Sequence, residues 1–204
     1  MIENIHWLGH DSFRIDGDVT VYIDPWQLPP NSPPADLILI THEHYDHYSK
    51  PDIDRIRTPQ TEIVTNATVA RTLNGGAHVV KPGDRLTVRG VSIEVLPAYN
   101  LNKKFHPKSA GHLGFVVTLG GQRIYHAGDT DAIPEMKGLR PDIALLPVSG
   151  TYVMDAEEAV EAVRLLQPGL AVPMHYGAIV GSEADARRFQ QLSPAPVRIL
   201  PKEA

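Results

Sequence analysis

The feature that most constrains this chain is a short run of metal-binding side chains that follows a predicted buried strand. Residues 42–47 read His-Glu-His-Tyr-Asp-His, and residues 35–40 before them are apolar apart from Asp36. An apolar run of this length is typical of a strand buried on both faces. Imidazole and carboxylate groups are common ligands of zinc and similar divalent ions. The pattern therefore predicts a metal site where a rigid strand meets a loop.

The spacing inside this run divides its side chains between two ions. Residues two apart in an extended segment project to the same side, so His42 and His44 can share one ion. Asp46 and His47 lie further along the chain and can serve a second ion. The alternative is a polar loop that is merely rich in histidine. The position directly after a buried strand favours the metal site.

Four ligands do not complete two coordination spheres, so other side chains must reach the site by folding. Asp129 and His175 each follow directly after a predicted strand, as His42 does. Taken alone, each can also be an ordinary turn residue. Their shared position at strand ends makes them candidates for the remaining ligands.

Strands and helices alternate along the chain, but several strands are joined by hairpins. The predicted strands cover residues 12–15, 19–23, 35–40, 62–64, 85–89, 91–96, 113–119, 122–125, 142–147 and 170–174, and the predicted helices 49–57, 66–73, 155–166 and 182–192. Asp155 and Glu158 form a capping-box pattern at the start of the third helix. Asn66 caps the second helix, and Gly75-Gly76 end it. Two mixed sheets packed face to face with helices outside would bury these strands.

Composition narrows the class of protein. The chain has 204 residues, 42 % of them hydrophobic and 21 % charged, which fits one globular domain over residues 1–204. A formal net charge of -5 argues against nucleic acid or an anionic membrane as a partner. The absence of cysteine excludes disulfides, thiolate ligands and a cysteine nucleophile. Without a signal-peptide pattern or a membrane-length apolar run, we expect a cytoplasmic protein with a small-molecule substrate. Homo-oligomerisation stays open.

Several motifs in a fixed order resemble the metallo-β-lactamase-fold hydrolases. They are Leu8-Gly9-His10, Ile23-Asp24-Pro25 and residues 41–47, 126–130 and 173–176. The resemblance covers nearly the whole chain. It points to the branch of uncharacterised metal-dependent hydrolases that is also similar to the L-ascorbate-6-phosphate lactonases and to N-acyl-phosphatidylethanolamine phospholipase D. It implies an α+β fold, a four-layer αββα sandwich with the metals at one edge.

The resemblance also implies which side chains hold which ion. His42 and His44 would bind the first ion. The second would take Asp46, His47 and His175. Asp129 would bridge both ions.

The first ion lacks one expected ligand. Much of the superfamily has a third histidine at the end of a central strand, where this chain has Tyr99-Asn100. His106 is the nearest histidine, and we prefer it as the third ligand. Asn100 and His112 are the alternatives.

Three other polar residues have expected roles near the metals. His10 either satisfies a buried backbone carbonyl or lies beside the ions as an acid, a base or a substrate contact; we favour the second role. Asp24 can orient a ligand imidazole, and His126 can act in a similar way.

These residues lead to a hydrolytic hypothesis. Two divalent ions would activate a hydroxide that attacks an ester, lactone or phosphodiester. Zinc suits the histidines best, and manganese, iron or nickel can use the same ligands. Asp46 would orient the nucleophile besides ligating. The candidates for the leaving-group acid are His10, Tyr152 and Tyr176.

Two other functions stay open. A phosphodiesterase or nuclease would use Lys103, Lys104 and Lys108 to attract a phosphate, although these lysines also fit a solvated loop. A metal-binding or ligand-sensing protein without catalysis is the second alternative, which a missing ligand at the first ion would favour.

Overall fold

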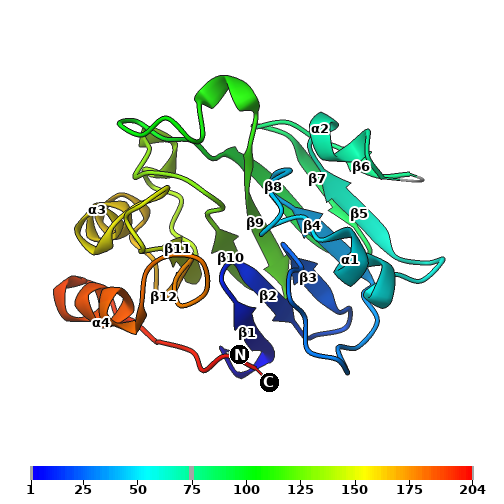
Figure 1. The fold of residues 1–204 in the computed structure, drawn as a ribbon, viewed down its shortest axis with the longest axis horizontal. Helices are drawn as coiled ribbons and strands as arrows, with labels where there is room; N and C mark the ends of the chain where they lie inside the picture. Colours follow the sequence, from blue (N-terminus) through cyan, green and yellow to red (C-terminus); the bar gives the residue numbers. More distant parts are fainter. Residues whose placement is uncertain (1, 74–75, 204) are drawn as a thin grey trace.

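Two six-stranded sheets form the centre of the molecule, a computed structural model that describes residues 2–73 and 76–203. The first sheet has the order β1-β2-β3-β4-β5-β6 and the second the order β12-β11-β10-β9-β8-β7. The sheets lie face to face, with α1 and α2 outside the first and α3 and α4 outside the second (Figure 1). The predicted αββα sandwich is confirmed.

The strands and helices have well-defined bounds. The first sheet contains β1 (Ile5–Gly9), β2 (Ser12–Ile15), β3 (Val21–Ile23), β4 (Leu37–Ile40), β5 (Glu62–Thr65) and β6 (His78–Val79). The second contains β7 (Arg85–Val88), β8 (Val91–Pro97), β9 (Leu113–Leu119), β10 (Gln122–His126), β11 (Ile143–Pro147) and β12 (Leu170–Met174). The α-helices are α1 (Lys50–Ile56), α2 (Ala67–Ala70), α3 (Ala156–Leu166) and α4 (Glu183–Leu192), and three short 3-10 helices cover Ile2–Asn4, Lys108–Ala110 and Pro134–Met136.

Strand β4 shows why the sequence folds into layers. All four of its side chains are fully buried. Leu37 and Leu39 pack into the core between the two sheets, whereas Ile38 and Ile40 pack into a second core beneath α1 and α2. Successive side chains of a strand point to opposite faces, so a continuous apolar run suits a strand between two layers.

The helices begin where the sequence predicts. Asp155 and Glu158 form the expected capping box of α3. Asn66 caps α2, but this helix ends at Ala70, short of the predicted residue 73. Gly75 of the predicted stop lies outside the described residues. Strands β1 and β6 lie outside the predicted strands. Strand β6 has two residues, too few to show an alternation, whereas β1 alternates apolar Ile5 and Trp7 around His6 and could have been predicted.

The order and direction of the strands bring distant residues to one edge. Strands β3, β4 and β5 run parallel, as do β10, β11 and β12. The segments after β4, β10 and β12 carry His42, Asp129 and His175, so parallel strand ends deliver them to the same side of the molecule. No helix in the described part of the chain is both long and apolar enough to cross a membrane.

Candidate metal centre

Two clusters of ligand-type side chains meet at this edge. His42, His44, His106 and Asp129 form the first group, and His10, Asp11, His47 and His175 form the second. In each group the potential ligand atoms all lie within 4.8 Å of one another. Every member is buried except His44, which is half-buried. The sequence predicted all of these residues except Asp11.

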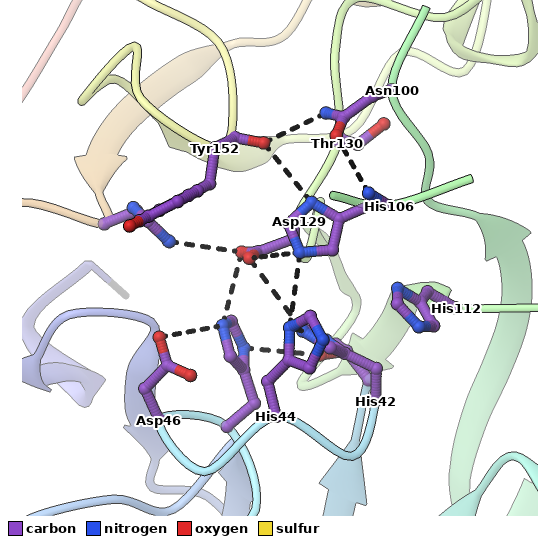
Figure 2. Close-up of polar contacts among 12 residues, drawn as sticks. His42, His44, Asp46, Asn100, His106, His112, Asp129, Thr130 and Tyr152 are labelled. Atoms are coloured by element: carbon purple, nitrogen blue, oxygen red, sulfur yellow. Dashed lines mark hydrogen bonds and ion pairs between the residues drawn. The ribbon is translucent and has the colours of Figure 1, made fainter. Parts of the chain in front are cut away.

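The first group gathers around one oxygen of Asp129. Oδ2 of Asp129 lies 3.1 Å from Nε2 of His106 and 3.9 Å from Nε2 of His42. Nδ1 of His44 lies 3.0 Å from Nε2 of His42 and 3.4 Å from Nε2 of His106. Figure 2 shows these four side chains converging, with His42 and His44 from one segment and His106 and Asp129 from two others.

The second group lies on the other side of Asp129. Its Oδ1 is 3.3 Å from Nε2 of His47 and 3.5 Å from Nε2 of His175. Oδ2 of Asp11 approaches the same two nitrogens, at 3.5 and 3.8 Å. The two imidazoles thus stand between two carboxylates. Asp129 therefore faces both groups, one oxygen to each.

Contacts at Nδ1 aim four imidazoles at the centre. Nδ1–H of His47 donates to Asp24 (2.8 Å), and Nδ1–H of His106 donates to the backbone carbonyl of Tyr152 (3.2 Å). Nδ1 of His42 lies 2.9 Å from the hydroxyl of Thr41, and Nδ1 of His175 lies 2.8 Å from that of Ser149. Such contacts fix the ring orientation and leave Nε2 free to bind a metal.

Asp24 also holds the end of β4 in place. Its Oδ1 accepts the backbone N–H of Thr41 (2.8 Å), and its Oδ2 accepts the hydroxyl of Thr41 (2.6 Å) as well as Nδ1–H of His47. The predicted contact between Asp24 and an imidazole of the site is present. His126 has a different part: its Nε2 meets the backbone carbonyl of Asp11 at 2.8 Å, which ties β10 to the turn between β1 and β2.

Glycine is required next to Asp129. Gly128 has φ +63°, and a Cβ there would lie 2.6 Å from the carbonyl oxygen of Leu113. A side chain would therefore both strain the backbone and push β9 away. The turn after β10 can place Asp129 between the two groups only because residue 128 has no side chain.

The donor atoms suit a divalent metal. Nε2 of His47, Nε2 of His175, Oδ1 of Asp129 and both oxygens of Asp11 are buried without a hydrogen-bond partner among the described residues. Buried polar atoms without partners are costly. Ligand atoms about 2.1 Å from a tetrahedral ion stand about 3.4 Å apart, close to the 3.3–3.8 Å that separate these atoms. In the first group the corresponding separations are 3.0–3.9 Å, so the residues fit a bound ion in each group.

Asp46 lies beside the second group rather than inside it. Its Oδ2 is 3.1 Å from Nε2 of His10 and 3.8 Å from Nε2 of His47, and its side chain is 14 % exposed. The sequence predicted Asp46 as a ligand of the second ion. Asp11, which is fully buried, lies in that group instead. Asp11 does not belong to a run of ligand-type residues with a recognisable spacing. Its position directly after His10 is the one signal in the sequence that could have identified it.

The third position of the first group is taken by His106. Oδ1 of Asn100 accepts the backbone N–H of His106 (3.0 Å), and its Nδ2 donates to Asp131 (3.1 Å) and to the carbonyl of Tyr152 (3.0 Å). Asn100 thus shapes the loop that delivers His106 (Figure 2). His112 stacks on His42, with ring centroids 4.5 Å apart, and its Nε2 lies 3.7 Å from Glu43.

The two groups differ in their electrostatics. Burial lowers the pKa of His42 well below its usual value, and burial together with His106 lowers that of His44.

In the second group burial also lowers the pKa of His47 and of His175, but the negative charge of Asp129 outweighs this effect. Asp129 and Asp24 raise the pKa of His47 well above its usual value, and Asp129 and Asp11 raise that of His175 to about 9. Burial likewise opposes ionisation of Asp129, but His47 and His175 lower its pKa well below the usual range.

This difference predicts proton release on metal binding. In the metal-free protein at pH 7, His47 and His175 carry protons and His42 and His44 do not. Zinc must displace those protons, so saturation at pH 7 should release at least about two protons, those of His47 and His175 in the second group. Zinc affinity should rise with pH through the range in which His175, with a pKa of about 9, loses its proton. Calorimetry in buffers of different ionisation enthalpy measures the release; binding without proton release at pH 7 would contradict the assignment.

Comparison with known proteins identifies the family. Residues 4–175 match the model of the beta-lactamase superfamily domain. The chain is 34 % identical to the UPF0173 metal-dependent hydrolase of Thermoplasma volcanium, over 94 % of this chain and 91 % of that protein. It is 34 % identical to the UPF0173 metal-dependent hydrolase of Thermoplasma acidophilum, over 93 % and 90 %.

Solved structures agree with the sequence relatives. The crystal structure of a protein described as a metal-dependent hydrolase from Parabacteroides distasonis has a TM-score of 0.86 at 36 % identity, covering 96 % of this chain and 91 % of that one. Igni18, a metallo hydrolase from Ignicoccus hospitalis, has a TM-score of 0.80 at 26 % identity, covering 98 % and 95 %. The chain therefore belongs to the metallo-β-lactamase superfamily, among the UPF0173 metal-dependent hydrolases.

Proposed function

We propose that this hydrolase works with two divalent ions and cleaves a carboxylic ester or lactone. The observation that carries the proposal is Asp129. Each of its carboxylate oxygens faces a separate group of buried imidazole nitrogens, 3.1 Å away in one group and 3.3 Å in the other. One carboxylate shared between two such groups is the arrangement expected of a two-ion site.

The geometry supports one division of the ligands between the two ions. The first ion would be held by His42, His44 and His106 and the second by Asp11, His47 and His175, with Asp129 bridging the two. Nitrogen-rich groups of this kind suit zinc, and manganese, iron or nickel can use the same donors. When bound, the ions supply a water that ionises near neutral pH and a positive charge that polarises the bond under attack.

Asp46 and His10 are the residues that would handle the proton of the attacking water. Asp46 lines the cleft above the two groups. Burial raises the pKa of Asp46, but the hydrogen bond from His10 and the charge of His47 outweigh it, so the net shift is downward. Asp46 is therefore ionised at neutral pH and can orient a water and accept its proton. His10 holds this carboxylate in place through the 3.1 Å contact.

Tyr152 is the best placed donor to the leaving group. It lines the same cleft, and its ring packs edge-on against Phe105 with centroids 4.6 Å apart. Tyr176 is instead stacked on Trp7, with centroids 4.8 Å apart, and does not line the cleft. Of the three candidates that the sequence left open, Tyr152 therefore fits this role and His10 serves the nucleophile side.

The experiment that tests the proposal is metal reconstitution. The protein is stripped with a chelator, titrated with zinc, manganese or nickel, and assayed on ester, lactone and phosphodiester substrates. We expect ester or lactone hydrolysis to rise with metal and to saturate at two ions per chain. His44→Ala should abolish it, and His78→Ala, on an exposed edge strand, serves as the matched control. Equal activity in the stripped protein would refute the proposal.

A further inference from the structure

We propose that the cleft beside the metal centre selects a substrate with an apolar acyl group, and discriminates against substrates that carry a negative charge away from the bond under attack. This inference rests on the proposed hydrolytic function and names its substrate class. Three independent features of the cleft support it: its size, its exposed apolar side chains and the sign of its charges.

The cleft has the size of a small-molecule site. Its volume is about 410 Å³, within the range of roughly 300–1,000 Å³ that such sites occupy. Its inner wall contains His44, His106, Asp129 and His175, which are the candidate metal ligands. A molecule in this cleft would therefore touch the metal centre at one end.

The outer wall is apolar. Tyr45, Phe105 and Ile179 line the cleft and are 66 %, 52 % and 38 % exposed. They make up half of the six large hydrophobic side chains that are exposed in the described chain. Single exposed hydrophobic residues are ordinary, but a cluster at a cleft marks a binding surface.

These apolar residues belong to the loops that carry the ligands. Tyr45 lies between His44 and Asp46, and Phe105 directly precedes His106. Phe105 packs on Tyr152, and Tyr45 lies edge-on to Trp26 with centroids 6.3 Å apart. The fold thus places an apolar surface directly beside the metal centre, as a site that holds the apolar part of a substrate requires.

Apart from its histidines, the charged side chains that line the cleft are carboxylates. Glu43, Asp46 and Asp129 line it, and no lysine or arginine does among the described residues. Asp129 faces the ion groups, so Glu43 and Asp46 give the remaining surface a negative sign. A negative charge on the part of a substrate that lies away from the metal centre would meet repulsion from these two carboxylates, with no lysine or arginine in the described lining to offset it.

The lysines that the sequence offered for phosphate binding are engaged elsewhere. Nζ of Lys103 lies 2.8 Å from Asp131 and 2.9 Å from Glu158. Nζ of Lys108 lies 2.8 Å from Glu135. Lys104 is exposed and lies outside the lining of the cleft. The phosphodiesterase alternative therefore lacks the cationic side chains on which it depended.

Matched substrates test the charge preference. The zinc-loaded protein is assayed on 4-nitrophenyl hexanoate and on the mono-4-nitrophenyl ester of adipic acid, which share a leaving group and differ by a terminal carboxylate. We expect kcat/KM to favour the neutral ester by at least about tenfold. Glu43→Gln should narrow this gap. Equal kcat/KM for the two esters, or faster cleavage of bis(4-nitrophenyl) phosphate than of the hexanoate, would overturn the inference.

Variants test the apolar surface. Phe105→Ala and Ile179→Ala should each lower the kcat/KM ratio of hexanoate to 4-nitrophenyl acetate about five- to tenfold, mainly through KM. Leu192→Ala, an equally apolar change at the end of α4, should leave the ratio unchanged. An unchanged ratio in both cleft variants would refute the apolar surface.

A binding measurement separates this inference from the proposed function. Saturation-transfer NMR follows 4-phenyl-2-butanone, an uncharged ketone that is not hydrolysed, on the zinc-loaded protein. We expect binding to wild type and to Leu192→Ala, and a loss of at least about fivefold in Phe105→Ala. This pattern without turnover of any ester would refute the hydrolytic proposal and uphold the apolar surface. Binding that Phe105→Ala does not change would overturn the inference even if esters are cleaved.

Discussion

Replacing Asp129 by asparagine is expected to release both metal ions and to abolish hydrolysis. The two oxygens of Asp129 face separate groups, at 3.1 Å from His106 and 3.3 Å from His47. Asparagine keeps one oxygen, loses the charge and places an N–H donor against one group. Loss of a residue that only hydrogen-bonds to a metal ligand typically lowers metal affinity by about 10–100-fold. We therefore expect the metal affinity to fall by more than about 100-fold when Asp129 itself is replaced.

Elemental analysis after dialysis and kcat/KM on the best ester measure this effect. Asp54→Asn is the matched control, because Asp54 is exposed on α1 and pairs with Lys50 at the surface. The control should keep two ions and wild-type activity. An Asp129→Asn protein that retains both ions would contradict the bridging role.

Replacing Asp11 by asparagine is expected to remove the second ion and leave the first. Both oxygens of Asp11 are buried without a hydrogen-bond partner in the described part of the chain, and Oδ2 lies 3.5 Å from His47. A buried carboxylate in that state needs a cation. The variant should bind about one zinc per chain, and its kcat/KM should fall by more than about 100-fold.

Asp46→Asn should behave differently from Asp11→Asn, and the comparison shows which of the two aspartates binds the second ion. Asp46 is partly exposed and already accepts a hydrogen bond from His10. We expect this variant to keep two ions and to lose kcat, because it removes the base and not a ligand. The assignment fails if Asp46→Asn loses an ion and Asp11→Asn keeps both.

The predicted strand ends show what sequence reasoning reaches well. The apolar run before His42 predicted a buried strand, and β4 packs against both cores. The same pattern placed Asp129 and His175 after strands, and the structure brings all three to one edge. This works because burial and side-chain alternation are local properties that a sequence displays directly.

The loop before β9 shows where such reasoning stops. No periodicity indicates how residues 98–112 fold, yet this loop decides whether Asn100, His106 or His112 completes the first group. The answer depends on Asn100, which binds the backbone of His106 and the carbonyl of Tyr152. These contacts join residues 6 and 52 positions apart, and no pattern within one segment can predict them.

The order of motifs along the chain was enough to predict the sandwich and the family, and it marked the His-x-His-x-Asp-His run as half of a candidate metal site. The arrangement of the carboxylates came from the three-dimensional packing, which places Asp11 among the candidate ligands and Asp46 at the cleft. The reason is geometric. Which oxygen meets which nitrogen depends on how the β1–β2 turn, the end of β4 and the turn after β10 pack together, and that packing is a property of the whole fold.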